Sequence, residues 1–160
     1  MSMFDPNTFL NSATTEALER RPPLPTENPE DPNGLYTAIL GEVTIADGII
    51  GKGDRAGQPW VQLVVPVRVQ VPGAVQDMIG GAKELTITDR PMLDITPQGQ
   101  LDNSVGKNRG LRVYREATRM NVKGEPFAPA MLSGKVVRVK IVHEMFRESL
   151  NERIKEVFPA

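Results

Sequence analysis

The sequence predicts a mainly β protein, a five-stranded Greek-key barrel with one helix between the third and fourth strands. Glycine and proline contribute 14 residues each to a chain of 160, an excess that favours turns and short strands over long helices. Apolar and polar residues alternate in several separate segments, and a period of two indicates strands with one face in a core. Closing these strands into a barrel removes the exposed edge that an open meander would leave.

The first two strands flank a glycine-rich loop. Residues 35–46 are rich in β-branched and aliphatic side chains and are predicted to end at the turn signal Asp47-Gly48. Residues 47–58 contain four glycines and are expected to form the loop. Residues 60–71 give the clearest strand pattern, with alternate positions expected to face the core: Val61, Leu63, Val65, Val67, Val69 and Val71. Within it Pro66 cannot donate to a ladder, which predicts a bulge or an unpaired edge there.

A turn or short helix (72–81), a third strand (84–95) and a loop (96–103) precede the predicted helix. That helix lies within residues 104–122, with its start weakened by two glycines and its stop expected at Gly124. One side of it collects the residues expected to pack inward: Leu111, Tyr114, Ala117 and Thr118.

Two further segments follow the helix. Residues 132–146 alternate valine and isoleucine with Arg138 and Lys140, which predicts a strand. Residues 150–158 fit a strand that sets Ile154 and Phe158 against cations, or a helix with a Ser149–Glu152 capping box. We take the strand because the barrel needs a fifth one. Three strands, one helix and two strands resemble the chain order of an OB-fold.

The first 34 residues differ from the rest, so residues 1–34 are expected to be an acidic, proline-rich arm and linker and residues 35–160 the folded domain. Residues 21–34 hold five prolines, which predicts an extended linker, and residues 11–20 could form a short helix capped by Asn11 or Ser12. The arm is expected to be mobile or to dock on a partner. Its net charge is −4, whereas residues 35–160 carry +3 and residues 104–123 alone +5.

Several function classes are disfavoured by composition. There is no cysteine, which excludes disulfides, thiolate zinc sites and cysteine nucleophiles. The single histidine, His143, excludes metal sites with several histidines and argues against most hydrolytic triads. No apolar run approaches the roughly 18 residues of a membrane span, and the first ten residues do not resemble a signal peptide. A magnesium nuclease built on Asp89, Asp94 and Asp102 is the weak catalytic alternative. We therefore expect a cytoplasmic protein without catalytic residues, metal or cofactor.

Cationic side chains lie on the outward strand faces, the loops and the helix, together with two aromatic candidates, Trp60 and Phe146. This combination is typical of proteins that bind single-stranded nucleic acid. Cations can follow a phosphate backbone, and an indole offers a surface for base stacking. Each residue also has a plainer interpretation, because outward cations keep edges soluble and Trp60 or Phe146 could pack at the core or its rim. The candidate binding residues are Lys52, Arg55, Trp60, Arg68, Arg90, Arg112, Arg115, Arg138, Lys140, Phe146, Arg153 and Lys155.

Three segments carry a family resemblance: LYTAILGEV at 35–43, GQPWVQLVVPVRV at 57–69 and LSGKVVRVKIVHE at 132–144. With the opening FDPNTFLNSATTEALERRPPLP, they resemble the small OB-fold single-stranded DNA-binding proteins of bacteriophages. The resemblance implies a homo-oligomer that coats single strands during phage replication or recombination in an infected bacterium. Many such proteins end in an acidic tail that recruits partners, whereas this chain ends VFPA. We expect the acidic arm at residues 1–34 to have the role of that tail, either by competing with DNA for the basic groove or by contacting replication proteins.

The alternative is a phage structural or adaptor protein. In that case the barrel and the N-terminal arm make protein contacts, and binding of oligonucleotides is weak at any salt concentration.

Overall fold

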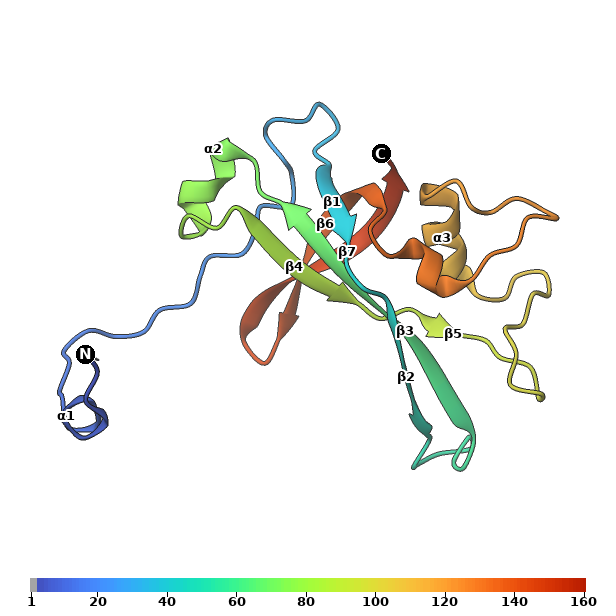
Figure 1. Ribbon diagram of the computed structural model, residues 1–160, viewed down its shortest axis with the longest axis horizontal. Coiled ribbons are helices and arrows are strands. Elements are labelled where there is room, and N and C mark those ends of the chain that lie inside the picture. Colours follow the sequence, from blue (N-terminus) through green and yellow to red (C-terminus); the bar gives the residue numbers. More distant parts are fainter. Residues whose placement is uncertain (1–2) are drawn as a thin grey trace.

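The computed structural model describes residues 3–160, which form mainly antiparallel β-structure with short helices at its margins (Figure 1). The strands are β1 (Tyr36–Leu40), β2 (Thr44–Ile49), β3 (Pro59–Gln70), β4 (Glu84–Asp89), β5 (Met92–Leu93), β6 (Val136–Phe146) and β7 (Ser149–Pro159). The helices are α1 (Pro6–Leu10), α2 (Gly73–Gln76) and α3 (Arg109–Ala117), with the 3₁₀ turns η1 (Asp77–Ile79) and η2 (Pro129–Leu132).

All seven strands belong to one antiparallel sheet, in which five follow the order β2-β3-β1-β6-β7 and the other two, β4 and β5, pair with β3 off this path. Strands β1 and β2 follow each other along one edge of β3, and β4 and β5 follow each other along its other edge. Strands β4 and β7 approach each other, but within residues 3–160 no hydrogen-bonded ladder joins them. The mainly β prediction is confirmed, and the sheet itself is open.

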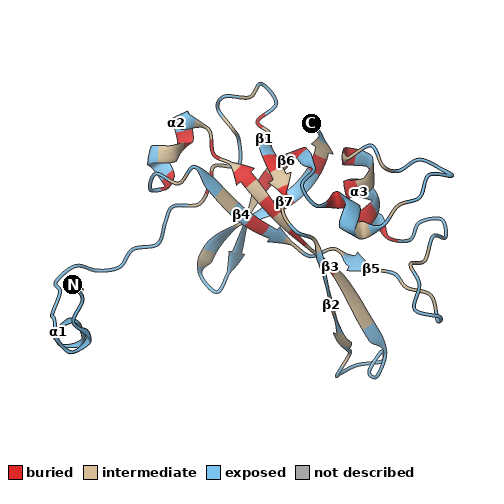
Figure 2. Ribbon diagram, viewed as in Figure 1, coloured by how far each residue is buried: buried red, intermediate tan, exposed pale blue. Residues whose placement is uncertain are grey.

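Strand β3 matches its sequence pattern closely. Its alternate residues from Leu63 to Val69 are buried, and they meet the other core residues in one cluster (Figure 2). The predicted irregularity at Pro66 is present. The N–H of Gly41 donates to the Pro66 carbonyl at 2.7 Å, at the break where β1 gives way to β2. Because Pro66 has no N–H to return this bond, the ladder changes register at that point.

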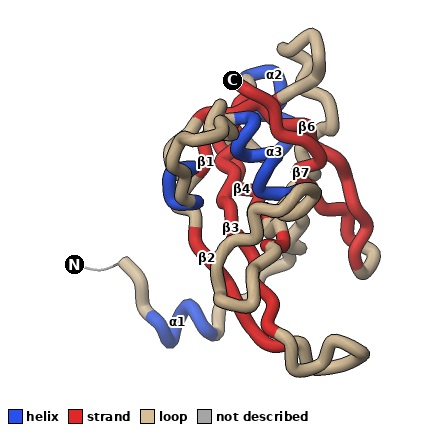
Figure 3. The backbone as a smooth tube through the Cα atoms, turned by 90° about the vertical axis from the view of Figure 1, so that its right-hand side faces the viewer, coloured by secondary structure: helices blue, strands red, loops and turns tan. Residues whose placement is uncertain are grey.

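The predicted turn at Asp47-Gly48 is wrong. Both residues lie inside β2, paired with Val61 and Trp60 of β3, and the ladder continues to the pair Ile49–Pro59. The loop is therefore shorter than expected and covers residues 50–58. Cross-strand pairing outweighs the local turn preference of Asp-Gly here. The resulting β2–β3 hairpin extends beyond the body of the protein in two perpendicular views (Figures 1 and 3).

Helix α3 lies within the predicted segment and buries the expected face, with Leu111, Tyr114 and Ala117 in the core. The hydroxyl of Tyr114 donates to the Asp89 carboxylate at 2.6 Å. Burial, together with that carboxylate, raises the pKa of Tyr114. The predicted stop at Gly124 is wrong, because the helix ends at Ala117 and Arg119 adopts a positive φ of 59°.

Strand β7 resolves the ambiguity at the C-terminal segment in favour of a strand. It pairs with β6 along its whole length. The register shifts between Lys140 and Ile141 of β6, because β7 has one extra residue there, Lys155, which forms a bulge. The bulge reverses the face of the residues that follow it. Ile154 and Val157 are both 9% exposed and face the core, whereas Phe158 is only half-buried. The inward position expected for Phe158 is therefore wrong.

The N-terminal helix lies earlier than predicted. Residues 11–20 are not helical, and α1 occupies Pro6–Leu10 instead. Asp5 caps it by accepting the backbone N–H of Asn7 at 3.0 Å. Pro6 at the first helical position already has the φ that a helix requires. An aspartate cap followed by proline is thus a stronger signal for the start of a helix than Asn11 or Ser12, because no proline follows either of these residues.

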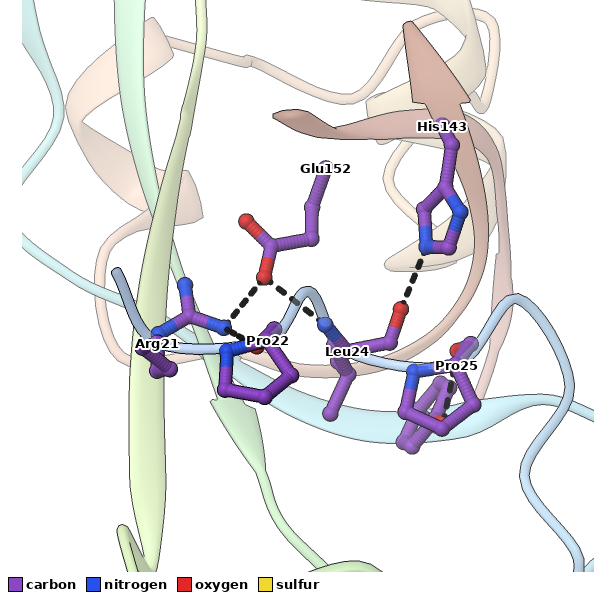
Figure 4. A network of polar contacts seen from close by, with 7 residues as sticks. Arg21, Pro22, Leu24, Pro25, His143 and Glu152 are labelled. Atoms are coloured by element: carbon purple, nitrogen blue, oxygen red, sulfur yellow. Dashed lines mark hydrogen bonds and ion pairs between the residues drawn. The ribbon is translucent and has the colours of Figure 1, made fainter. Parts of the chain in front are cut away.

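Residues 21–25 of the proline-rich segment are extended and lie against the sheet (Figure 4). Residues 26–34 instead form a loop of turns, closed by the N–H of Asn28 donating to the Gly34 carbonyl at 2.9 Å, so the extended conformation predicted for all of residues 21–34 is wrong there. Leu24 is 0% exposed and belongs to the common core. Its N–H donates to Glu152 at 2.8 Å, and its carbonyl lies 2.6 Å from Nε2 of His143. The hydroxyl of Tyr36 donates to the Pro25 carbonyl at 2.8 Å, and burial raises the pKa of Tyr36 to about 12. Proline alone predicts extension, but it does not reveal this docking.

Glu152 is the polar anchor of the docked segment. Its carboxylate accepts from Leu24 and pairs with Arg21 at 2.5 Å, and its side chain is 13% exposed. Burial acts to raise the pKa of Glu152, but the bonds from Arg21 and Leu24 outweigh it and lower the pKa below the usual range. The ionised form of this carboxylate therefore stabilises the docked position of residues 21–24.

Candidate nucleic-acid interface

The outward face of strands β3, β4 and β5 brings together the predicted residues Trp60, Arg68 and Arg90. The pairing of β3 keeps one register from Gln70–Glu84 to Val61–Leu93, so Arg90 falls opposite Val64. Residues opposite each other in a ladder share a face, and alternate residues along a strand do too. The shared face, away from the buried valines, therefore carries Trp60, Gln62, Val64, Pro66, Arg68 and Gln70 with Thr86, Thr88, Arg90 and Met92.

Trp60 lies across its ladder partner, Gly48. A Cβ atom added at Gly48 would stand 2.6 Å from the indole ring, which places the indole directly over the glycine backbone. Any larger residue at position 48 would displace the ring, so the missing side chain creates the seat. Trp60 is half-buried. The indole is thus fixed on the hairpin, outside the central core, with part of its surface open to solvent.

Lys52 and Arg55 sit on the loop at the tip of the β2–β3 hairpin. Both are exposed, and within residues 3–160 neither forms an ion pair. Two loop glycines, Gly53 and Gly57, adopt φ near +86° and +87°, a conformation that side chains resist. This loop presents two cations beyond the indole.

Arg68 stands on the same face as Trp60, but it is neutralised. Its Nε and the Glu84 carboxylate are 2.8 Å apart, and a second bond joins the two groups at 3.1 Å. This bidentate pair raises the pKa of Arg68 and lowers that of Glu84, which Gln70 also contacts at 3.0 Å. A phosphate would have to compete with Glu84 for the guanidinium. The sheet face around Arg68 is polar and nearly uncharged.

A second group of predicted cations lies on β6 and β7, and half of it is also paired. Arg138 binds Asp31 at 2.7 Å, where the N–H of Leu35 helps to hold the pKa of Asp31 low. Arg153 binds Glu144 at 2.6 Å. Lys140 and Lys155 form no ion pair within the described residues 3–160.

Phe146 lies at the tip of the β6–β7 hairpin, where the residue is 63% exposed. The guanidinium of Arg147 stands 5.2 Å from its ring. Arg147 and Glu148 form the two-residue turn and both have positive φ, 47° and 65°. Type I′ hairpins require this backbone, for which glycine and asparagine are the usual residues. Phe146 is therefore displayed beside a tight turn, on a different hairpin from Trp60.

Helix α3 places Arg112 and Arg115 on the outer side of the fold. Arg112 is 3.7 Å from Glu116, whereas Arg115 donates to the Met120 carbonyl and stacks over Phe127 at 4.3 Å. Both line a pocket of about 280 Å³ that Lys107 also borders. The cations of the helix thus form a group separate from the β3 face.

The three aspartates considered for a metal take other roles. Asp89 accepts from Tyr114, while Asp94 and Asp102 support the buried Asn108, which donates to the carbonyls of both at 2.9 Å. Among residues 3–160, no group of three or more carboxylate or imidazole side chains could hold a metal ion.

Two members of the face, Gly48 and Met92, are not among the residues predicted for the site. The Asp47-Gly48 pair predicts a turn, although a glycine opposite a tryptophan in a hairpin is itself a signal for ring packing. Met92 lies opposite Gln62 and is 53% exposed, and its sulfur is 3.5 Å from the Gln62 amide. It adds a polarisable side chain to the same side as Trp60.

Comparisons with protein-family models, with characterised proteins and with solved structures give no match for this chain. No helix in the described part of the chain has the length and apolar character needed to cross a bilayer.

Proposed function

We propose that this protein binds single-stranded DNA without strong sequence preference and without catalysis, in phage replication or recombination. The observation that carries the proposal is the seat of Trp60 on Gly48, beside a nearly uncharged sheet face and below a loop with two unpaired cations. An immobilised indole loses little freedom when a base stacks on it. Each stacked base contributes about 1–3 kcal/mol, whatever its identity.

We further propose that the fold is a variant of the OB-fold. The strand order supports this if β1 with β2 counts as a single bent first strand and β4 with β5 as the third. The helix α3 then lies between the third and fourth strands, and the two protruding hairpins correspond to the loops that grip ligands in OB-folds. Both hairpins, β2–β3 and β6–β7, extend toward the lower part of Figure 1, the first to the right and the second to the left.

The number of unpaired cations bounds the electrostatic part of binding. On the β3 face and its loop, Lys52, Arg55 and Arg90 form no ion pair among residues 3–160. Each neutralised phosphate of a single strand contributes about −0.7 to the slope of log K against log salt. Three contacts give a slope near −2, so moderate affinity with a clear salt dependence is expected.

Titration with oligo-dT, followed by Trp60 fluorescence, tests the proposal. Stacking should quench the emission in proportion to the bound fraction, and affinity should fall as salt rises. Because Trp60 is the one tryptophan of the chain, the signal reports on this position alone. Saturable binding with unchanged Trp60 emission would move the interface elsewhere, and no binding at low salt would reject the function.

A matched pair of arginine variants separates free from paired cations. Arg55→Ala should reduce the salt slope by about 0.7, because it removes one phosphate contact. Arg68→Ala removes a cation that Glu84 already neutralises, so its slope should stay close to that of the wild type. An equal reduction of the salt slope in the Arg55→Ala and Arg68→Ala variants would contradict the assignment of the interface to the loop.

The exposed N-terminal arm favours the second candidate, a phage structural or adaptor protein. Such a protein should bind oligo-dT weakly at every salt concentration. The same titration therefore separates the two functions.

A further inference from the structure

Residues 3–19 form an exposed arm with large apolar side chains. Phe9, Leu10 and Leu18 are 68%, 79% and 104% exposed. The arm also carries three acidic residues and no basic one. Exposed apolar side chains concentrated on one projecting segment are typical of an interaction site.

The tip of the arm is preorganised. Asp5 caps α1, and the rings of Phe4 and Phe9 meet with centroids 5.1 Å apart. These aromatic residues occupy the positions of a hydrophobic staple, one before the cap and one at the fourth helical residue. The tip therefore presents an aromatic knob whose conformation is largely set before it meets a partner, which reduces the entropic cost of docking.

The base of the arm is fixed, and it directs the arm away from the body. Arg20 donates to the Ser149 hydroxyl, and Arg21 pairs with Glu152, both at the β6–β7 hairpin. From there residues 3–19 run outward from the rest of the chain (Figures 1 and 2). Seventeen residues can span up to about 55 Å when extended, enough to reach a neighbouring molecule.

A groove of matching chemistry lies at the other end of β7, around Phe158. Two adjoining pockets of about 660 and 390 Å³ both border this half-buried ring. Val113 and Ala117 of α3 contribute apolar surface to the larger pocket. The unpaired cations at its borders, within residues 3–160, are Arg109, Lys140 and Lys155, against the single unpaired acid Glu156.

We propose that the arm of one copy, residues 3–19, docks in the Phe158 groove of a second copy. The apolar knob matches the apolar lining, and the acidic arm matches the groove's surplus of cations. The arm leaves its own molecule at the Ser149 end of β7, on a course away from the Val157–Pro159 end where the groove lies (Figure 1). This direction favours a neighbour's groove over its own.

The contact joins two different surfaces, so it is heterologous. Repetition produces an open chain of molecules or, where the rotation closes, a ring of two or more copies. The proposal goes beyond DNA binding and does not depend on it, because every residue it uses meets protein.

Two full-length variants, each defective on one side, test the contact by sedimentation velocity without DNA. The arm variant carries Phe9→Ser and Leu10→Ser. The groove variant carries Arg109→Glu and Lys155→Glu; both positions are exposed, and an acid at the first residue of α3 suits the helix dipole. Matched controls are Ile49→Ser with Met78→Ser, and Lys83→Glu with Lys123→Glu, all exposed and outside the groove.

The average mass of the wild type and of both controls should rise above 17.6 kDa with concentration. Each defective variant should associate at least about 100-fold more weakly. An equimolar mixture of the two should form a pair of twice that mass and grow no further, because it offers one intact arm and one intact groove. A monomeric wild type, variants that associate normally, or a mixture that stays monomeric would each overturn the proposal. Circular dichroism of every variant confirms that it is folded.

Discussion

Leu24 tests whether residues 21–25 belong to the folded core. Leu24→Ala is expected to lower the free energy of unfolding by about 2–3 kcal/mol. The side chain is 0% exposed and packs in the common cluster, and a buried Leu→Ala change costs about 2–5 kcal/mol. The lower part of that range applies because the docked segment can relax around the vacated space.

Urea unfolding followed by circular dichroism measures the effect. With a slope of about 2 kcal/mol per molar urea, the midpoint should fall by about 1–1.5 M. Leu18→Ala is the matched control, since Leu18 lies six residues earlier and is 104% exposed; its effect should stay within about 0.5 kcal/mol. Equal midpoints for the two variants would refute the docking of the proline-rich segment.

Two further predictions concern Glu152 and α3. The depressed pKa of Glu152 means that its stabilisation is present above its ordinary value of 4.5 and is lost as pH falls through the lower folded value. The stability difference between wild type and Glu152→Gln should therefore be constant near neutral pH and shrink below about pH 4 in urea titrations; a pH-independent difference contradicts the assignment. Gly110→Ala should cost about 1 kcal/mol in thermal unfolding, because the new Cβ would stand 2.5 Å from Pro91 and overpacking outweighs the better helix propensity. Gly73→Ala, where the Cβ meets open space, is the control and should be neutral or stabilising.

The strands were predictable from sequence because burial of one sheet face imposes a period of two. The valine alternation of β3 and β6 follows this rule. The ladder break at Pro66 was predictable for a different local reason, because proline has no N–H to donate. Boundaries were less predictable, as Asp47 and Gly48 show. Their turn preference is local, whereas their position inside β2 depends on pairing with residues of β3.

The candidate site was predicted in part. Register places Trp60, Arg68 and Arg90 on one face, as alternation along the strands suggests. The neutralisation of individual arginines was not predictable, because their acidic partners come from other segments. Arg68 on that face binds Glu84 of β4, and Arg138 on β6 binds Asp31, which is more than a hundred residues away in the chain.

The amino-acid order by itself determined which segments carry most of the strand residues and, for β3 and β6, which side faces the core. These properties depend on neighbours one to four residues away. The tertiary structure alone decided that Leu24 lies in the core, that the bulge at Lys155 turns Phe158 outward, and that four of the candidate arginines have carboxylate partners. Three of those ion pairs, like the burial of Leu24, join residues that are not neighbours within a turn of helix, so only the folded arrangement brings them within reach.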